Sequence, residues 1–282
     1  MEKKQNIEKK RLDIKSVIRD KSPKLAKWIP GFAISYLRKI THEDLINYLI
    51  DTFGHLKGYD FSKALIENFN ITIETEGVQN LPNDGRYVFV SNHPLGGFDG
   101  HIIMYLVGKH FPNYKFLVND ILMNLKNMHG VFIPVNKHGK QGIEYARKID
   151  NAYKSDDQIL TFPAGLVSRK IKGQVMDLIW QKNFITKAKQ HKRDIIPIHM
   201  SGGNTKFFYR LSNIRKMLGI KANIEMLYLI DETVKHQNKK FIVKFGKPIS
   251  WETFDSSKRP AEWAKFVKQE VYKMDGVNTV PF

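Results

Sequence analysis

The segment YVFVSNHPLGGFDG, residues 87–100, joins an apolar run to a histidine, two glycines and an aspartate. The unbroken apolar run at its start is typical of a strand that is buried on both faces. In open α/β sheets ligands bind beyond the carboxyl ends of the strands, which is where His93 would lie. The segment therefore predicts an α/β fold and, at the end of one strand, a functional site.

Short β-rich runs recur on both sides of this segment, from about residue 71 onward. Several of them are separated by stretches long enough to form helices, which predicts a central, mostly parallel or mixed sheet flanked by helices. We expect residues 71–282 to form this α/β domain. The expected strands lie in ITIETEG (71–77), RYVFVSN (86–92), YKFLVN (114–119), GVFIPVN (130–136), QILTFPAG (158–165), DIIPIHMSG (194–202), NIEMLYLI (223–230) and KFIVKFGKPI (240–249).

Residues 1–70 are predicted to be helical. Pro30-Gly31 interrupts one helix, and another is expected over roughly residues 42–56. Apolar residues alternate with cations here, as in helices that lie at a membrane interface, so we expect a membrane-associating region. The alternative is that the apolar stripe packs on the α/β domain. The residues concerned are Trp28, Ile29, Phe32 and Ile34, with Lys24, Lys27, Arg38 and Lys39 beside them.

Lysine and arginine outnumber aspartate and glutamate by 46 to 28, which gives a net charge of +18. This charge predicts attraction to a polyanion, such as an anionic membrane surface, an acidic carrier protein or nucleic acid.

The chain has no cysteine, so disulfides and a cysteine nucleophile are excluded. No run reaches the eighteen or so apolar residues of a spanning helix, and the basic N-terminal stretch lacks the pattern of a secretory signal. We therefore expect a cytoplasmic protein that is peripheral on the inner face of the cell membrane.

His93 and Asp99 have the chemistry of a general-base pair. A neutral imidazole takes a proton from a hydroxyl, and a carboxylate at its other ring nitrogen fixes the tautomer and stabilises the charged form. Pro94 and the Gly96-Gly97 pair allow a turn tight enough to bring Asp99 back to His93. They would also leave room for a substrate to approach the backbone.

Two other interpretations of these residues remain open from residue types alone. Asp99 is also suited to cap a helix that starts near Gly100, with His93 serving backbone groups in the turn. A metal site would need His93, Asp99 and His101 as ligands, but no spacing of the HExxH type supports it. We therefore expect no metal cofactor.

The stretch NHPLGGFD resembles the first motif of the glycerolipid acyltransferases, the lysophosphatidic acid acyltransferase-like family. In that family Asn-His is followed by an aspartate that orients the histidine, usually after four intervening residues, whereas five separate the pair here. The resemblance implies that His93 and Asp99 are catalytic residues of an acyltransferase. Three later segments occur in the family's order: GVFIPVNK (130–137), FPAGLVSR (162–169) and IPIH (196–199).

Departures from the family pattern bear on the acceptor. The third motif is usually FPEGTRS, and Ala164 and Val167 replace its glutamate and arginine, while the arginine of the second motif is missing. Because those family residues hold a glycerol phosphate, their loss suggests a different acceptor head group. The chain resembles the hemolysin-like branch that acylates the lyso forms of ornithine or glycine lipids.

The resemblance also implies a mechanism and a set of substrate-binding residues. His93 would remove the proton of a lyso lipid hydroxyl, and the alkoxide would attack a thioester of acyl carrier protein or CoA, with backbone amides near Gly165 as oxyanion donors. Lys137 and Arg169 would contact anionic groups. The substrate-binding set is Asn92, Gly96, Gly97, Lys137, Phe162, Pro163, Gly165, Ser168 and Arg169.

The sequence is compatible with two other functions. The first is ordinary 1-acylglycerol-3-phosphate acylation, with Lys137 and Arg169 replacing the missing arginines. The second is a nonenzymatic basic protein that binds nucleic acid or a membrane. No helix-turn-helix, RNP-like or zinc-finger signature is present, so we expect no nucleic-acid partner.

Overall fold

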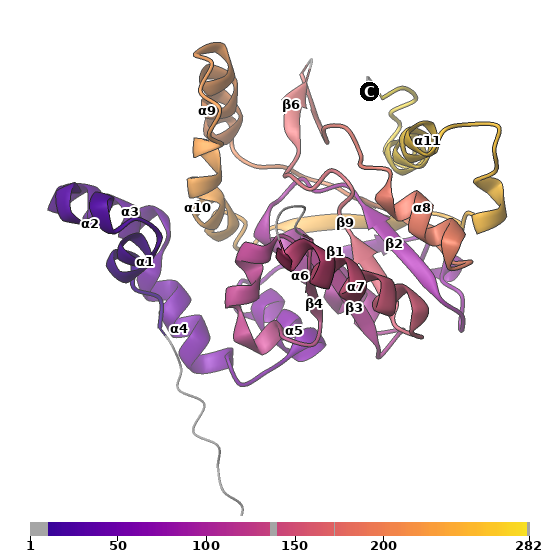
Figure 1. The fold of residues 1–282 in the computed structure, drawn as a ribbon, viewed down its shortest axis with the longest axis horizontal. Helices are drawn as coiled ribbons and strands as arrows, with labels where there is room; N and C mark the ends of the chain where they lie inside the picture. The colour runs from indigo at the N-terminus through magenta and orange to yellow at the C-terminus, as the bar shows by residue number, and fades with distance from the viewer. Residues whose placement is uncertain (1–10, 136–139, 172, 281–282) are drawn as a thin grey trace, which may run out of the picture.

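The computed structural model describes residues 11–135, 140–171 and 173–280. Its centre is a seven-stranded sheet with the strand order β1-β9-β8-β2-β5-β3-β4 (Figure 1). Neighbouring strands are parallel except for β8 and β9, which run antiparallel. The prediction of an α/β fold with a mostly parallel, mixed sheet is confirmed. The strands are β1 (Thr72–Glu76), β2 (Tyr87–Ser91), β3 (Tyr114–Val118), β4 (Phe132–Pro134), β5 (Gln158–Thr161), β8 (Asp194–Met200) and β9 (Lys240–Phe245).

Strand β2 lies in the middle of the sheet, and its side chains alternate between two hydrophobic cores. Phe89 belongs to one core, whereas Val88 and Val90 belong to the other. In the register of the sheet, Phe89 lies opposite Leu160 of β5 and Ile196 of β8. The strand is buried on both faces, as its unbroken apolar sequence predicts.

Helices cover both faces of the sheet. On the face of Phe89, helices α5 (Gly58–Asn68) and α6 supply buried residues to the core, and α6 starts directly after the segment that carries His93. On the face of Val88, the buried residues come from α7, α8 and α11. The bounds are α6 (Gly97–Gly108), α7 (Lys140–Lys154), α8 (Asn183–Gln190) and α11 (Pro260–Lys273).

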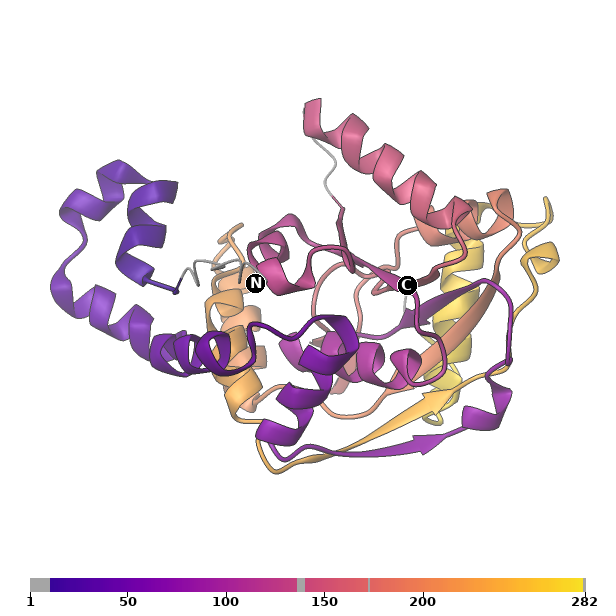
Figure 2. The same cartoon turned by 90° about the horizontal axis from the view of Figure 1, so that it is seen from below.

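Within residues 11–70 the structure has five helices: α1 (Ile14–Lys21), α2 (Pro23–Trp28), α3 (Gly31–Ile40), α4 (Glu43–Phe53) and α5 (Gly58–Asn68). Helix α5 packs against α6 through Phe61 and Leu65, while α1, α2 and α3 project from the part of the molecule that contains the sheet (Figures 1 and 2). No helix of the described residues has both the length and the apolar character needed to span a bilayer. The division of the chain near residue 70 stays a prediction.

One expected strand is wrong. Residues 223–230 form the 3₁₀ helix η4 (Ile224–Tyr228) and the start of α10 (Leu229–Val234). A short apolar run does not by itself distinguish a strand from a helix. Here the polar Glu225 within the run is buried between two arginines, while Leu229 packs beside Gly96, the residue before α6. Both contacts are made across the fold, so no local pattern in the run predicts them.

The described chain also contains elements that the sequence did not predict individually. A two-stranded hairpin joins β6 (Arg169–Ile171) to β7 (Gln174–Met176), and helix α9 (Lys206–Met217) precedes η4. In Figure 1 both stand out from the sheet. Shorter 3₁₀ helices are η1 (Val78–Asn80), η2 (Asp120–Asn124), η3 (Lys126–Met128) and η5 (Trp251–Thr253).

Candidate active site

The connection from β2 to α6 is fixed at its start by Asn92. The side-chain amide of Asn92 donates to the carbonyl oxygen of Met200 at 2.9 Å, and its oxygen accepts from the N–H of Met200 at 2.7 Å. Because Met200 ends β8, the neighbour of β2, this amide ties the ends of the two strands together. Asn92 is buried, so in the structure it holds the base of the loop that carries His93.

His93 and Asp99 meet across the first turn of α6. Oδ2 of Asp99 lies 2.5 Å from Nδ1 of His93 and also accepts the backbone N–H groups of Leu95 and Gly96 at 2.9 and 3.0 Å. Gly96 has a φ of +86°, a conformation that glycine adopts at little cost. One carboxylate therefore caps the helix and binds the imidazole, so the two roles considered for Asp99 coexist.

Burial sets the electrostatics of this pair. Asp99 is fully buried, which raises the pKa of its carboxyl, while the hydrogen bond and charge of His93 and the two backbone amides oppose that rise. Because the carboxylate accepts at Nδ1, the imidazole is held with Nε2 as the nitrogen that can take up a proton. The His93 side chain remains partly exposed, at 16%.

The third motif packs against the first. The ring of Phe162 stacks on the imidazole of His93, with centroids 4.1 Å apart and planes 7° from parallel. The backbone N–H of Ser168 donates to the carbonyl oxygen of His93 at 2.7 Å. The structure thus brings Phe162 and Ser168, both predicted as site residues, into direct contact with His93.

A buried carboxylate that the sequence analysis missed lies behind His93. Asp177 accepts the hydroxyl of Ser168 at 2.5 Å, the backbone N–H of His93 at 3.2 Å and the indole N–H of Trp180 at 2.9 Å. Burial raises the pKa of the Asp177 carboxyl, and the hydrogen bonds from Ser168 and Trp180 oppose the rise. One sequence signal was present: Asp177 is a lone acid in the apolar run VMDLIW, residues 175–180.

Helix α11 also holds Asp177, through Tyr272 and Lys268. The hydroxyl of Tyr272 accepts the backbone N–H of Asp177 at 2.7 Å, and Nζ of Lys268 donates to the Asp177 carbonyl oxygen at 2.9 Å. Burial lowers the pKa of Lys268 to about 8. These contacts explain why Lys268, a charged residue, is buried on the inner face of α11.

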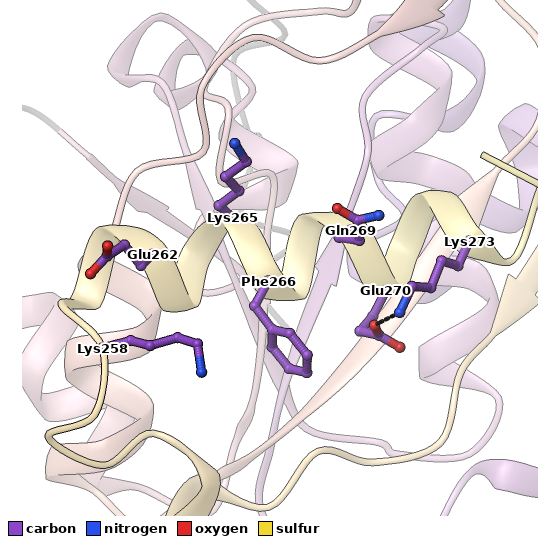
Figure 3. Close-up of a pocket in the computed structure, with 7 residues that line it drawn as sticks. All are labelled: Lys258, Glu262, Lys265, Phe266, Gln269, Glu270 and Lys273. Atoms are coloured by element: carbon purple, nitrogen blue, oxygen red, sulfur yellow. Dashed lines mark hydrogen bonds and ion pairs between the residues drawn. The ribbon is translucent and has the colours of Figure 1, made fainter. Parts of the chain in front are cut away.

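The outer face of the same helix bears a shallow hollow of about 430 Å³ (Figure 3). Lysines and glutamates alternate around it, and Lys273 pairs with Glu270. This charge pattern is that of a solvated helix face. The hollow is lined by Lys258, Glu262, Lys265, Phe266, Gln269, Glu270 and Lys273.

The glycines of the two motifs have different surroundings. A Cβ on Gly96 would lie 3.0 Å from Leu229 of α10, and one on Gly97 would lie 3.1 Å from Thr233, so α10 occupies the space beside this pair. Gly165 has a φ of +66° with open space around it, and its N–H donates to the Phe162 carbonyl oxygen in a turn. Open space therefore lies beside Gly165 and not beside the first glycine pair.

Arg169 lies away from the imidazole, in a buried ion cluster. Its guanidinium lies 2.9 Å from Glu225, which also binds Arg215 at 2.8 Å. The Arg169 guanidinium is thus already bound inside the protein, by a carboxylate that it shares with Arg215. Pro163 accepts the N–H of Gln181 through its carbonyl oxygen. Lys137 lies outside the described residues.

His101, the third ligand of the metal interpretation, faces elsewhere. Its Nδ1 lies 3.1 Å from the hydroxyl of Ser62, and burial lowers its pKa to about 4. Among the described residues, no three His, Asp or Glu side chains gather as a metal site would require. The arrangement at His93 is instead that of an oriented general base.

Comparisons with known proteins agree with this chemistry. The chain matches the family model described as "Acyltransferase" over residues 16–279. It is 48% identical over 264 residues to the lyso-glycine lipid O-acyltransferase of Bacteroides thetaiotaomicron, covering 93% of this chain and 97% of the relative. The lyso-glycine lipid O-acyltransferase of Phocaeicola vulgatus is 46% identical over 264 residues, which cover 93% of this chain and 95% of the relative.

Among solved structures the chain resembles the 1-acyl-sn-glycerophosphate (LPA) acyltransferase PlsC from Thermotoga maritima. The match has a TM-score of 0.49 and 16% sequence identity. It covers 86% of this chain and 81% of that one.

Proposed function

This chain belongs to the acyltransferase family, and from that premise we propose that it transfers a fatty acyl group from a thioester to the free hydroxyl of a lyso-glycine lipid. The acyl-transfer activity follows from the family itself. Support for a lyso lipid acceptor comes from two relatives, 48% and 46% identical over nearly their whole length, that are named for acylating lyso-glycine lipid.

The contact between His93 and Asp99 carries the proposed mechanism. Asp99 holds the imidazole through Nδ1, and Nε2 removes the proton of the acceptor hydroxyl as the oxygen attacks the thioester carbonyl. The tetrahedral intermediate then collapses, the carbon–sulfur bond breaks, and His93 returns the proton to the leaving thiolate. The products are an ester and a free thiol, and no covalent enzyme intermediate is needed.

The donor is a thioester of acyl carrier protein or of CoA in this proposal. Both are anionic, and the net charge of +18 favours either. The open space at Gly165, in the motif that stacks Phe162 on His93, is where we place the reacting groups. No metal cofactor enters the mechanism, because a general base and positioning suffice for direct transfer.

Acylation of 1-acylglycerol-3-phosphate has less support. In the third motif Val167 is buried beside Phe208 and Tyr209, where the family has an arginine. Arg169 cannot easily replace that arginine because its guanidinium is bound to Glu225. In this motif a phosphate-bearing acceptor would therefore find neither the family's arginine, which Val167 replaces, nor the Arg169 guanidinium, which Glu225 binds.

We also propose that the enzyme works as a peripheral protein on the inner face of the cell membrane. The acceptor is a lipid, and Trp28 and Phe32 of the projecting N-terminal helices are 85% and 79% exposed. Lys27 and Lys39 lie exposed near them in the sequence. Aromatic residues with neighbouring cations are typical of interfacial helices.

The experiment that tests the proposal is acyl transfer by the purified chain. Lyso-glycine lipid and lysophosphatidic acid are each supplied with palmitoyl-CoA or palmitoyl acyl carrier protein. We expect thiol release and an acylated product, identified by mass spectrometry, with lyso-glycine lipid. Acylation of lysophosphatidic acid alone would overturn the proposed acceptor, and no thiol release with any of the four pairs would overturn the activity.

A further inference from the structure

Helix α9 and the turn after it carry an apolar surface that no other described element covers. Met217 and Leu218 at the end of α9 are 78% and 63% exposed. Several exposed apolar residues within one short stretch of the chain are typical of an interaction site. We call this the α9–η4 surface, and its exposed apolar residues are Phe207, Ile214, Met217, Leu218, Ile220 and Leu227.

The exposed charges of α9 and of the segment through η4 are of one sign. Residues 206–224 contain five lysines and arginines and no aspartate or glutamate. Arg215 is buried against Glu225, but Lys206, Arg210, Lys216 and Lys221 are exposed. A solvated protein face would normally mix both signs, as the outer face of α11 does. Apolar side chains edged by cations instead complement an anionic lipid surface.

The α9–η4 surface is continuous with the projecting N-terminal helices. The hydroxyl of Tyr36 in α3 lies 2.6 Å from the hydroxyl of Tyr228 in η4. The ring of Tyr228 in turn meets the edge of Phe207 of α9, with centroids 5.0 Å apart. In Figure 1, α9 and the N-terminal helices both stand out from the sheet, on the same side of the view. Two segments separated by about 170 residues thus approach the same region.

The surface is also connected to the third motif. Arg169 follows Ser168, which contacts His93, and the Arg169 guanidinium binds the Glu225 carboxylate. Glu225 is the second residue of η4 and also binds Arg215 of α9 at 2.8 Å. The motif loop therefore has a fixed position relative to α9 through one buried carboxylate.

We propose that the α9–η4 surface is a second lipid-contacting site, which binds an anionic bilayer together with the N-terminal helices and holds the third motif at the membrane. This inference rests on the proposed function, because a lipid acceptor gives the enzyme a bilayer to approach. The occupant is the bilayer itself and not a second copy of the chain. The clustered cations would repel the same surface of another copy.

The test is flotation of the full chain with vesicles that contain neither lyso lipid nor thioester. Vesicles of phosphatidylcholine with phosphatidylglycerol are compared with vesicles of phosphatidylcholine alone. The variant is Met217→Ser with Leu218→Ser, and the matched control is Ile143→Ser, since Ile143 on α7 is 80% exposed. All three positions are open to solvent, and circular dichroism checks that each variant is folded.

We expect the double variant to bind anionic vesicles roughly tenfold or more weakly, and the control to bind like the wild type. Lys216→Ser or Lys221→Ser should each weaken binding about fivefold, the equivalent of about 1 kcal/mol, on anionic vesicles only. Equal binding by the wild type and the folded double variant overturns the inference. The inference is also overturned if the wild type binds no vesicles. It is overturned as well if the wild type forms a concentration-dependent dimer that the double variant abolishes while vesicle binding is unchanged.

These outcomes are separable from those of the acyl-transfer assay. Vesicle binding requires no substrate, so failed acyl transfer with intact, Met217-dependent binding would overturn only the proposed function. Acyl transfer to lyso-glycine lipid in detergent, with vesicle binding that is indifferent to Met217 and Leu218, would overturn only the second lipid contact.

Discussion

Oδ2 of Asp99 lies 2.5 Å from Nδ1 of His93, and the same oxygen caps the first turn of α6. The imidazole is therefore oriented by a group that is itself fixed by two backbone amides and by full burial. A carboxylate held this way has little freedom to turn away when the imidazole becomes charged. The pair is preorganised for proton transfer at Nε2.

His93→Ala should lower kcat for thiol release by about 10² to 10⁴, the usual contribution of a general base. Asp99→Asn should lower it by about 10² or more, because an amide N–H facing Nδ1 favours the wrong tautomer. His110→Gln, an exposed histidine two residues beyond the end of α6, is the control and should retain full activity. Wild-type turnover by His93→Ala would contradict the mechanism.

The sequence predicts this pair because all its determinants are local. The apolar strand, the tight turn and the helix start lie within residues 87–100. The hydrogen bonds of Asp99 span at most six residues. Propensity and spacing therefore suffice for this part of the site.

The other parts of the site depend on contacts that no local pattern contains. Asp177 reaches the backbone of His93 across 84 positions of sequence, and Glu225 reaches Arg169 across 56. The run that contains Glu225 was wrongly expected to be a strand, because its buried charge is explained only by the two arginines that it meets. Such residues become visible only when the fold brings them together.

Asp177→Asn should lower kcat about tenfold while KM stays nearly constant. The buried carboxylate accepts from Ser168 and from the His93 backbone, so the neutral amide weakens both bonds and loosens the loop. The measurement is steady-state thiol release, with folding followed by circular dichroism. A merely structural role would lower the amount of folded enzyme and leave its kcat unchanged.

A double-mutant cycle sharpens this prediction. Ser168→Ala removes one donor to Asp177, and the double variant Ser168→Ala with Asp177→Asn should be little worse than Asp177→Asn alone. Residues of one hydrogen-bond network show this non-additivity. Fully additive losses in kcat would mean that Ser168 and Asp177 act independently. That result would contradict the prediction, which rests on the 2.5 Å hydrogen bond between the two side chains.

Phe162→Leu should lower kcat by about two- to tenfold, since stacked aromatic pairs contribute about 0.5–1.5 kcal/mol beyond area burial. Phe162 stacks on His93 at 4.1 Å and limits how the imidazole can turn. Phe162→Tyr keeps the ring and should retain most of the activity. Phe266→Leu, in the hollow on α11, is the control. Equal kcat for Phe162→Leu and the wild type would exclude a role for the stack.

Trp28→Ser with Phe32→Ser should weaken flotation with anionic vesicles roughly tenfold or more, because both rings are exposed on the projecting helices. Activity on lyso lipid in detergent micelles should stay near that of the wild type, since neither residue touches the site. Undiminished flotation would mean that the N-terminal helices are not membrane contacts.

His236 should make the folded state sensitive to acid. Burial lowers the pKa of His236 to about 4, from an ordinary value of 6.5, because the charged imidazole is poorly solvated beside Asn204. Between these two values the unfolded chain binds the proton and the folded chain does not. Stability therefore rises with pH through this window, and it is lost as the pH falls from about 6.5 toward 4.

The full size of this effect is about 3 kcal/mol, from a difference of about 2.5 pKa units. His236→Gln keeps a polar group near Asn204 but does not titrate, so its free energy of unfolding should fall less steeply between pH 6.5 and 4.5 than that of the wild type. Urea unfolding at a series of pH values measures both slopes. Because the other acids and histidines titrate alike in both proteins, their contribution cancels in the difference, and parallel slopes would show that His236 is protonated as readily in the folded as in the unfolded chain.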